Sequence, residues 1–320
     1  MGLELSIVVP VYRSQSTLRE LYRRIKTAMD LARIPFEIIF VEDGGGDDSW
    51  NIIKSISVED SRIFGIKLGR NYGQHNALLC GIRAAQGRVI VTLDDDLQNP
   101  PEEIPKLLDQ LNRGCDVVYG YPEVQTHGFL RNSASRITKL ALGNMMGVEV
   151  ASKTSAFRAF RGYIKESFVD YRSPAVNIEV LLTWGTTRFG HVVVKHDPRI
   201  AGELGYSLKK LMAHAINMAT GFSTLPLRIA SILGILFSLV GVVILIYVLF
   251  RYLAVDSPVP GFSFIASIVT IFAGAQLFCL GVIGEYLARM YSRAMEKPAY
   301  SVVERVGDGV EVDSSLRSVN

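Results

Sequence analysis

Two long apolar stretches constrain this chain more than any other feature of its sequence. They run from Ile229 to Phe250 and from Phe262 to Gly284, and neither contains a charged residue. At about 1.5 Å per residue in an α-helix, each can cross the roughly 30 Å hydrocarbon core of a bilayer. Buried helices of soluble proteins are usually shorter and amphipathic. We therefore predict two transmembrane helices, at residues 229–250 and 262–284.

Basic residues indicate how these two helices are oriented. Arg228 precedes the first, while Arg289, Arg293 and Lys297 follow the second, and the connecting loop carries one arginine and one aspartate. Because cytoplasmic flanks of membrane helices are enriched in Lys and Arg, both ends of the pair are expected in the cytoplasm. Residues 251–261 then form an external loop, and residues 285–320 a cytoplasmic tail.

Composition excludes several other classes of protein. The formal net charge is only +3, which gives no reason to expect a nucleic-acid partner. The cysteines Cys80, Cys115 and Cys279 lack metal-ligand spacing and indicate no disulfide framework. The apolar run near the amino-terminal end is short and has no basic leader, so we do not expect a signal peptide.

The first two thirds of the chain alternate short apolar runs with polar helical stretches. Strands are expected at residues 5–10, 36–41, 63–68, 88–93 and 116–119, and helices at 17–31, 48–57, 75–85 and 102–112. This alternation predicts an α/β domain with a mostly parallel sheet over residues 1–206. Residues 207–228 are expected to form a juxtamembrane amphipathic helix.

Two acidic clusters follow predicted strands, where ligands bind in parallel sheets. The first contains Asp94, Asp95, Asp96 and Gln98. In an extended chain Asp94 and Asp96 would lie on the same side. Two carboxylates and an amide oxygen suit Mg²⁺ or Mn²⁺, with phosphate oxygens completing the shell. A solvated turn could also tolerate three adjacent acids.

The second cluster is the run from Glu42 to Ser49. Its Asp43 could accept a hydrogen bond from a base or a ribose hydroxyl, and its glycines would let a ligand approach the backbone. In a dinucleotide-binding fold a Gly-x-Gly-x-x-Gly motif follows the first strand. Here the glycines follow the second strand, which argues against that fold.

Together these segments resemble inverting family 2 glycosyltransferases of the GT-A fold, in particular the polyprenyl-phosphate branch. That branch includes dolichyl-phosphate mannose synthases and bacterial undecaprenyl-phosphate glucosyltransferases. The resemblance extends over about residues 5–293. Its matching stretches are Ser6-Ile-Val-Val-Pro-Val-Tyr12, Val41-Glu-Asp-Gly44, Arg70-Asn-Tyr-Gly-Gln74, Asp94-Asp-Asp-Leu-Gln-Asn-Pro-Pro-Glu102, Val117-Val-Tyr-Gly120 and Phe222-Ser-Thr-Leu-Pro-Leu-Arg228.

The resemblance implies roles for individual residues. Those implied to bind the nucleotide-sugar are Pro10, Tyr12, Asp43, Arg70, Gln74 and Asp94. Asp96 and Gln98 would ligate Mg²⁺ or Mn²⁺ on the diphosphate, so Asp94 and Asp96 are the catalytic candidates. The acceptor phosphate would be bound by Arg131, Ser135 and Arg199, since an arginine fork matches phosphate oxygens.

The sequence also departs from the family pattern. Ala156 stands where the family usually has an aspartate before Phe-Arg, and it marks either weakened activity or an introduced inactivating change. The intact acidic residues elsewhere favour the second reading. Tyr12 is followed by Arg13-Ser14 rather than Asn-Glu, so the acidic contact of the family is lost there.

The resemblance implies metal-dependent, inverting transfer of a hexose from a nucleotide-sugar to a polyprenyl phosphate at the lipid bilayer. UDP-glucose is the first expected donor and GDP-mannose the second, in a bacterial inner membrane, and a homo-oligomer is compatible with the sequence. A processive polysaccharide synthase is an alternative, although Gln-x-x-Arg-Trp is absent around both Trp50 and Trp184. A non-catalytic nucleotide-sugar-binding membrane protein is another, for which Ala156 is the main argument.

Overall fold

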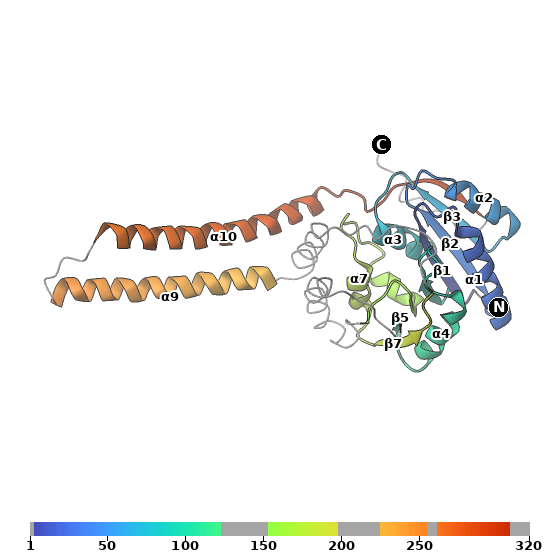
Figure 1. Cartoon of the computed structure of the whole chain (residues 1–320), viewed down its shortest axis with the longest axis horizontal. Helices are drawn as coiled ribbons and strands as arrows, with labels where there is room; N and C mark the ends of the chain where they lie inside the picture. The colour runs from blue at the N-terminus through green and yellow to red at the C-terminus, as the bar shows by residue number, and fades with distance from the viewer. Residues whose placement is uncertain (1–2, 123–152, 198–224, 255–260, 308–320) are drawn as a thin grey trace. The chain divides into compact units, whose positions relative to one another are not determined.

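A computed structural model describes residues 3–122, 153–197, 225–254 and 261–307 (Figure 1). The chain divides into two compact units. The first contains the described residues up to 197 together with those from 296 onward, and it holds the sheet. The second lies within residues 207–295 and holds two long helices. Each unit is described by itself.

The first unit is built on an eight-stranded sheet in the order β7-β5-β6-β4-β1-β2-β3-β8. Its strands are β1 (Leu5–Val11), β2 (Phe36–Glu42), β3 (Ile63–Leu68), β4 (Val89–Thr92), β5 (Val117–Pro122), β6 (Arg158–Arg161), β7 (Phe189–Val194) and β8 (Val302–Val306). The neighbours β4, β1, β2 and β3 are parallel, as are β5 and β7. The prediction of a mostly parallel sheet is confirmed, and the antiparallel strands β6 and β8 are additions to it.

Every residue of β1 and of β2 is buried. Continuous apolar runs of this kind are typical of strands covered on both faces by helices. On one face, Ile7 and Val9 join a core cluster with residues of the helices α1, α2 and α4. On the other face α3 approaches so closely that a Cβ on Gly81 would lie 2.4 Å from a methyl carbon of Val8. Successive side chains of β1 point to opposite faces of the sheet and therefore pack against a layer of helices on each face.

The helices of this unit lie close to their expected positions. They are α1 (Leu18–Ala32), α2 (Ser49–Glu59), α3 (Gln74–Ala84), α4 (Ile104–Asn112) and α7 (Ile178–Gly185), with 3-10 turns at Pro101–Glu103 and Gly162–Ser167. The apolar residues of α1 recur at helical spacing, and Leu18, Leu21, Ile25 and Met29 are all buried. The helix expected from residue 102 begins instead as a 3-10 turn.

The region expected to be a cytoplasmic tail contains regular structure. The second long helix continues to Ala294, and residues 302–306 form β8, antiparallel to β3 at the edge of the sheet. Trp50 Nε1 donates to Glu304 Oε2 at 2.8 Å, and Gly69 N donates to Ser301 O at 3.0 Å. The sequence analysis missed this strand because five residues with two charges give little periodic signal.

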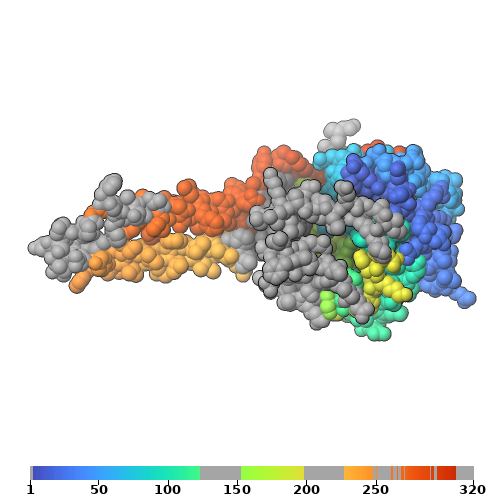
Figure 2. Space-filling view, viewed as in Figure 1, coloured from blue at the N-terminus to red at the C-terminus, as the bar shows by residue number. Residues whose placement is uncertain are grey.

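The second unit consists of α9 (Leu225–Ala254) and α10 (Phe262–Ala294), which lie side by side in Figure 1. Phe237 and Phe272 meet edge to face, with ring centroids 5.7 Å apart. Two segments are long and apolar enough to cross a membrane, Leu227–Tyr247 and Ile271–Ala288, and 6% and 0% of their residues are buried. Figure 2 shows the outer faces of the two helices uncovered. They are candidate membrane spans, close to the predicted positions. Residues 207–224 of the expected juxtamembrane helix lie outside the described residues, and its last four residues, 225–228, form the first turn of α9.

Candidate active site

Three parallel strands bring the two acidic clusters to one edge of the sheet. In register, Val11 at the end of β1 lies opposite Glu42 at the end of β2, while Val8 lies opposite Thr92 at the end of β4. The residues that follow these strands therefore gather at the carboxyl edge, as the sequence predicts. In such sheets ligands bind beyond this edge.

Asp95, the middle residue of the first cluster, joins the loop after β4 to the loop after β1. Its Oδ2 accepts hydrogen bonds from Tyr12 N at 3.0 Å and from Ser14 Oγ, and its carbonyl accepts from Thr17 Oγ1 at 2.7 Å. Burial raises the pKa of the Asp95 carboxyl, against the lowering effect of the Ser14 and Tyr12 donors. Asp95 therefore holds together the loops that follow β1 and β4.

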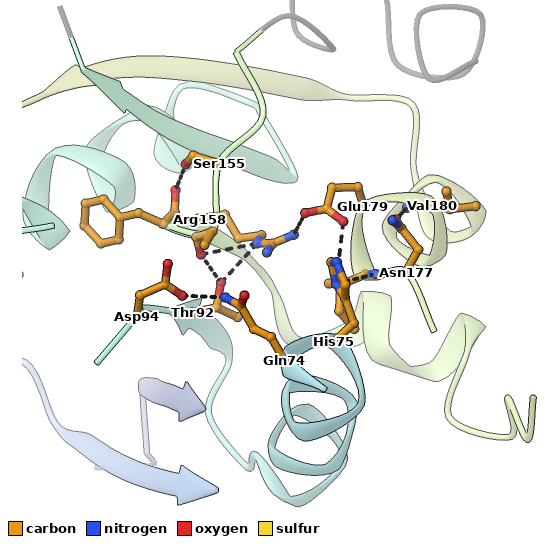
Figure 3. A network of polar contacts seen from close by, with 12 residues as sticks. Gln74, His75, Thr92, Asp94, Ser155, Arg158, Asn177, Glu179 and Val180 are labelled. Atoms are coloured by element: carbon orange, nitrogen blue, oxygen red, sulfur yellow. Dashed lines mark hydrogen bonds and ion pairs between the residues drawn. The ribbon is translucent and has the colours of Figure 1, made fainter. Parts of the chain in front are cut away.

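Asp94 contacts another residue expected at the site. Gln74 Nε2 donates to Asp94 Oδ1 at 2.6 Å, as Figure 3 shows. Gln74 is the first residue of α3, and it follows Gly73, whose φ of 93° suits glycine. Two predicted donor-binding residues that are twenty positions apart in the chain are therefore in direct contact.

The expectation that Asp94 and Asp96 share one side of an extended chain is wrong. Asp95 and Asp96 lie in a turn, and Leu97 has a φ of 61°, in the left-handed region. Within this turn Gln98 N donates to Asp96 Oδ1 at 3.1 Å. A short polar loop favours such side-chain-to-backbone bonds over an extended conformation.

The chemistry of this turn fits a divalent cation only in part. Carboxylate and amide oxygens are the hard donors that Mg²⁺ and Mn²⁺ prefer. Among the described residues, however, no three His, Cys, Asp or Glu side chains are grouped closely enough to hold a metal ion by themselves. The donor set of Asp96 and Gln98 therefore suits an ion whose remaining ligands are phosphate oxygens and water.

Asp43 fixes the loop that carries Arg70 and Gln74. Its two carboxylate oxygens accept from Tyr72 N at 2.7 Å and from Gly73 N at 2.8 Å. Burial raises the pKa of the Asp43 carboxyl even though these two N–H groups lower it. Sequence reasoning assigned Asp43 a contact with the nucleotide and did not foresee its contact with this loop.

Glu42 adds a second buried carboxylate next to Asp43, at the end of β2. Its Oε1 accepts from Gly45 N at 2.6 Å, while its Oε2 is buried and has no hydrogen-bond partner among the described residues. A buried carboxylate oxygen without a donor is unusual in a folded protein. The sequence analysis named Glu42 as part of the second cluster and assigned no role to its carboxylate.

The glycine run admits protein backbone where a ligand was expected. A Cβ on Gly44 would lie 2.6 Å from the backbone carbon of Arg70, and a Cβ on Gly45 would lie 2.8 Å from Arg13 N. At Gly46, by contrast, nothing lies within 4 Å of that position. Protein backbone thus accounts for the glycines at positions 44 and 45, and the approach of a ligand to this run stays a prediction.

The remaining donor-side candidates differ in exposure. Tyr12 is 45% exposed, with the Arg13 guanidinium 5.3 Å from its ring centroid. The Arg70 guanidinium lies 4.6 Å from the ring centroid of Tyr72. Pro10 is buried inside β1, where it lies beyond the residues that pair with β4 and so costs that ladder no hydrogen bond.

Ala156 lies beside the end of β4. Thr92 Oγ1 donates to the carbonyl of Ala156 at 2.6 Å, and Ser155 Oγ donates to Gly120 O at 2.5 Å. Arg158 is buried two residues further on and contacts Thr92 and Glu179. Glu179 was missed, because nothing in the sequence connects a helical glutamate with an acidic loop more than eighty residues earlier. Arg131, Ser135 and Arg199 lie outside the described residues.

Comparison with known proteins gives consistent results. The family model described as Glycosyl transferase family 2 matches residues 6–172. A Bacillus subtilis protein named uncharacterized glycosyltransferase YkcC is 33% identical over 306 residues, 95% of each chain. The undecaprenyl-phosphate 4-deoxy-4-formamido-L-arabinose transferase of Pseudomonas fluorescens is 34% identical over 300 residues, covering 93% of this chain and 88% of that protein.

A solved structure is similar in fold. The glucosyl-3-phosphoglycerate synthase of Mycobacterium tuberculosis, crystallised with Mn²⁺, UDP-glucose and phosphoglyceric acid, superposes with a TM-score of 0.50. The match covers 68% of this chain and 78% of that one at 18% identity. At this identity the likeness supports the GT-A fold and carries no substrate to this chain.

Proposed function

Because this chain belongs to glycosyl transferase family 2 and is a glycosyltransferase, we propose that it transfers a sugar from a nucleotide-sugar to a polyprenyl phosphate. One observation carries the lipid acceptor. The similarity to undecaprenyl-phosphate transferases extends over 93% of the chain, well beyond the residues 6–172 that the family model matches. The two apolar helices are thus part of what is shared. A lipid substrate accounts for them, since the enzyme must meet its acceptor at the bilayer.

The proposed reaction is a single displacement. A phosphate oxygen of the acceptor attacks the anomeric carbon, the bond from that carbon to the donor diphosphate breaks, and the configuration inverts. Because the acceptor phosphate is already an anion at neutral pH, the step needs no strong general base. A divalent cation on the diphosphate would stabilise the negative charge of the leaving group.

The residues of the carboxyl edge support the donor half of this proposal. Asp94 and Gln74, in contact with each other, would bind the ribose or the sugar, while Tyr12 and the loop anchored by Asp43 would flank the base. Asp96 and Gln98 would hold the cation together with the diphosphate. Donor residues thus come from the ends of three strands and the start of α3.

Two arginines and a serine would bind the phosphate of the acceptor. We assign the acceptor phosphate to Arg131, Ser135 and Arg199, on the chemical ground that an arginine fork binds phosphate oxygens in pairs. If these residues bind the acceptor, Arg131→Ala and Arg199→Ala in an Ala156→Asp background will weaken acceptor use about tenfold to a hundredfold and leave nucleotide binding nearly unchanged. Loss of nucleotide binding with normal acceptor use would move both arginines to the donor pocket.

Three donors are proposed for testing. The sequence favours glucose and then mannose, whereas the curated relatives are named for 4-deoxy-4-formamido-L-arabinose. The full-length protein carrying Ala156→Asp, in detergent with Mg²⁺ or Mn²⁺, would be incubated with undecaprenyl phosphate and each nucleotide-sugar, and lipid products identified by mass spectrometry. A monoglycosylated lipid phosphate from one donor is the expected result. Polymeric product would favour a processive synthase, and no lipid product from any donor would refute the proposal.

The active site is proposed to face the cytoplasm. This rests on the positive charges that flank the two candidate spans. A single cysteine introduced near Pro258 should react with an impermeant maleimide in intact cells. One near Lys297 should react only after permeabilisation, and the reverse pattern would invert the topology.

A further inference from the structure

A closed circuit of polar contacts surrounds the carboxyl end of β4 (Figure 3). Gln74 Nε2 is 2.6 Å from Asp94 Oδ1, Arg158 Nε is 3.0 Å from Thr92 Oγ1, and Arg158 Nη1 is 3.0 Å from Glu179 Oε1. The second carboxylate oxygen, Glu179 Oε2, is buried and accepts no hydrogen bond from a described residue; it lies 3.7 Å from His75 Nδ1 and forms an ion pair with it when the imidazole is protonated. The chain itself closes the circuit, because Gln74 precedes His75 and Thr92 lies two residues before Asp94. The six residues come from α3, β4 and its loop, β6 and α7.

The charged members of this circuit are withdrawn from solvent. The side chain of Arg158 is 1% exposed and that of Glu179 is 16% exposed. Burial alone would raise the pKa of Glu179, but the opposing charges of Arg158 and His75 outweigh it and hold that pKa below its ordinary value. A buried ion pair of this kind contributes little net stability.

Glu179 contacts both arms that lead to Asp94. One carboxylate oxygen contacts Arg158 on β6, which in turn bonds Thr92, and the other faces His75, the second residue of α3, which follows Gln74. The start of α7 is itself fixed, since Asn177 caps it by accepting from Val180 N at 3.0 Å. Glu179 therefore sets the separation between β6 and the start of α3.

We propose that Glu179 is a positioning residue of the donor site, which holds Gln74 against Asp94 without touching the substrate. The inference rests on the proposed function, because it assumes that Asp94 and Gln74 bind the nucleotide-sugar. Small displacements of binding groups weaken binding strongly, and side chains that orient them contribute through that effect. Loss of the Glu179 charge should therefore weaken donor binding and leave the acceptor site unaffected.

The first experiment compares two variants of the full-length protein in detergent. Glu179→Gln keeps the shape of the side chain and removes its charge. The control is Asp116→Asn, which removes another buried carboxylate that contacts an arginine, here one that is 65% exposed, with Arg188 Nη2 at 2.8 Å. Asp116 lies just before β5, at the opposite end of the sheet. Binding of UDP and of GDP in the presence of MnCl₂ is measured by calorimetry, alongside thermal unfolding.

The Glu179→Gln variant should bind the nucleotide that the wild type prefers about tenfold more weakly, which corresponds to roughly 1.4 kcal/mol. The control should lose stability and keep its affinity. In a double-mutant cycle, Glu179→Gln combined with Gln74→Ala should weaken binding less than the product of the separate effects, because both act on one contact. With an active donor, the KM for donor should rise while that for acceptor stays constant.

Two results would overturn the inference. If Glu179→Gln destabilises the protein as the control does and leaves nucleotide affinity unchanged, the positioning role is wrong while the proposed function stands. If the wild type binds neither nucleotide, the proposed function fails and the inference with it. Should Glu179→Gln not fold, His75→Gln tests the same arm at a half-buried position, and unchanged affinity in that variant would also refute the role.

Discussion

Replacing Asp95 tests whether the middle acid of the first cluster is a structural anchor. Both hydrogen bonds to its side chain, from Tyr12 N and from Ser14 Oγ, end on the single oxygen Oδ2. An asparagine can present one carbonyl oxygen in the same place, whereas an alanine removes the acceptor altogether. Asp95→Asn should therefore preserve the junction between the two loops, and Asp95→Ala should break it.

The size of the effect follows from these two bonds. A hydrogen bond to a charged acceptor contributes about 1.5–3 kcal/mol, so two contribute about 3–6 kcal/mol before the cost of burying the carboxylate is subtracted. We expect a net loss of roughly 2–4 kcal/mol for Asp95→Ala and less than about 1 kcal/mol for Asp95→Asn. For a domain of this size that is a fall of roughly 5–15 °C in Tm for the alanine variant.

The pH dependence gives the two variants a second signature. Since burial raises the pKa of Asp95 in the folded protein, the unfolded chain releases this proton first as pH rises. The wild type therefore loses stability as pH rises from the ordinary aspartate pKa to the raised one, and a variant without this carboxyl loses less, since the raised pKa of Asp43 still contributes. Thermal unfolding of the full-length protein across that range measures both effects. Equal stability of the alanine and asparagine variants at neutral pH would refute the reasoning.

Three further changes test other parts of the structure. Asp96→Asn should weaken Mn²⁺-dependent nucleotide binding by about tenfold or more, and affinity that is the same with and without EDTA in the wild type would contradict the metal assignment. Gly44→Ala should cost several times more stability than Gly46→Ala, since only the first places a Cβ against backbone, 2.6 Å from Arg70; equal falls in Tm would refute the packing argument. Trp50→Phe removes the bond to Glu304 and should speed hydrogen exchange in β8 but not in β1, whereas unchanged exchange in β8 would show that this bond does not hold the strand.

Local sequence pattern was enough to predict the main helices and strands. The continuous apolar runs of β1 and β2 and the helical spacing of Leu18, Leu21 and Ile25 in α1 identified the parallel core. The two uncharged stretches identified both long helices, because length and hydropathy alone satisfy the requirement for crossing a bilayer. The acidic clusters were placed at the carboxyl edge because parallel strands end together.

The contacts of each polar side chain became known from the folded structure and could not be predicted from the sequence. Asp94, Asp95 and Asp96 are equivalent in the sequence, yet Asp94 meets Gln74, Asp95 joins two loops, and Asp96 closes a turn. The sequence does not show which contact each aspartate makes, because the partners come from β1, α3 and the turn itself. The folded conformation of the loop determines which partner each one contacts. In the same way, β8 and Glu179 became visible only in the folded chain, since a short edge strand and a single buried charge are specified by partners far away in the sequence.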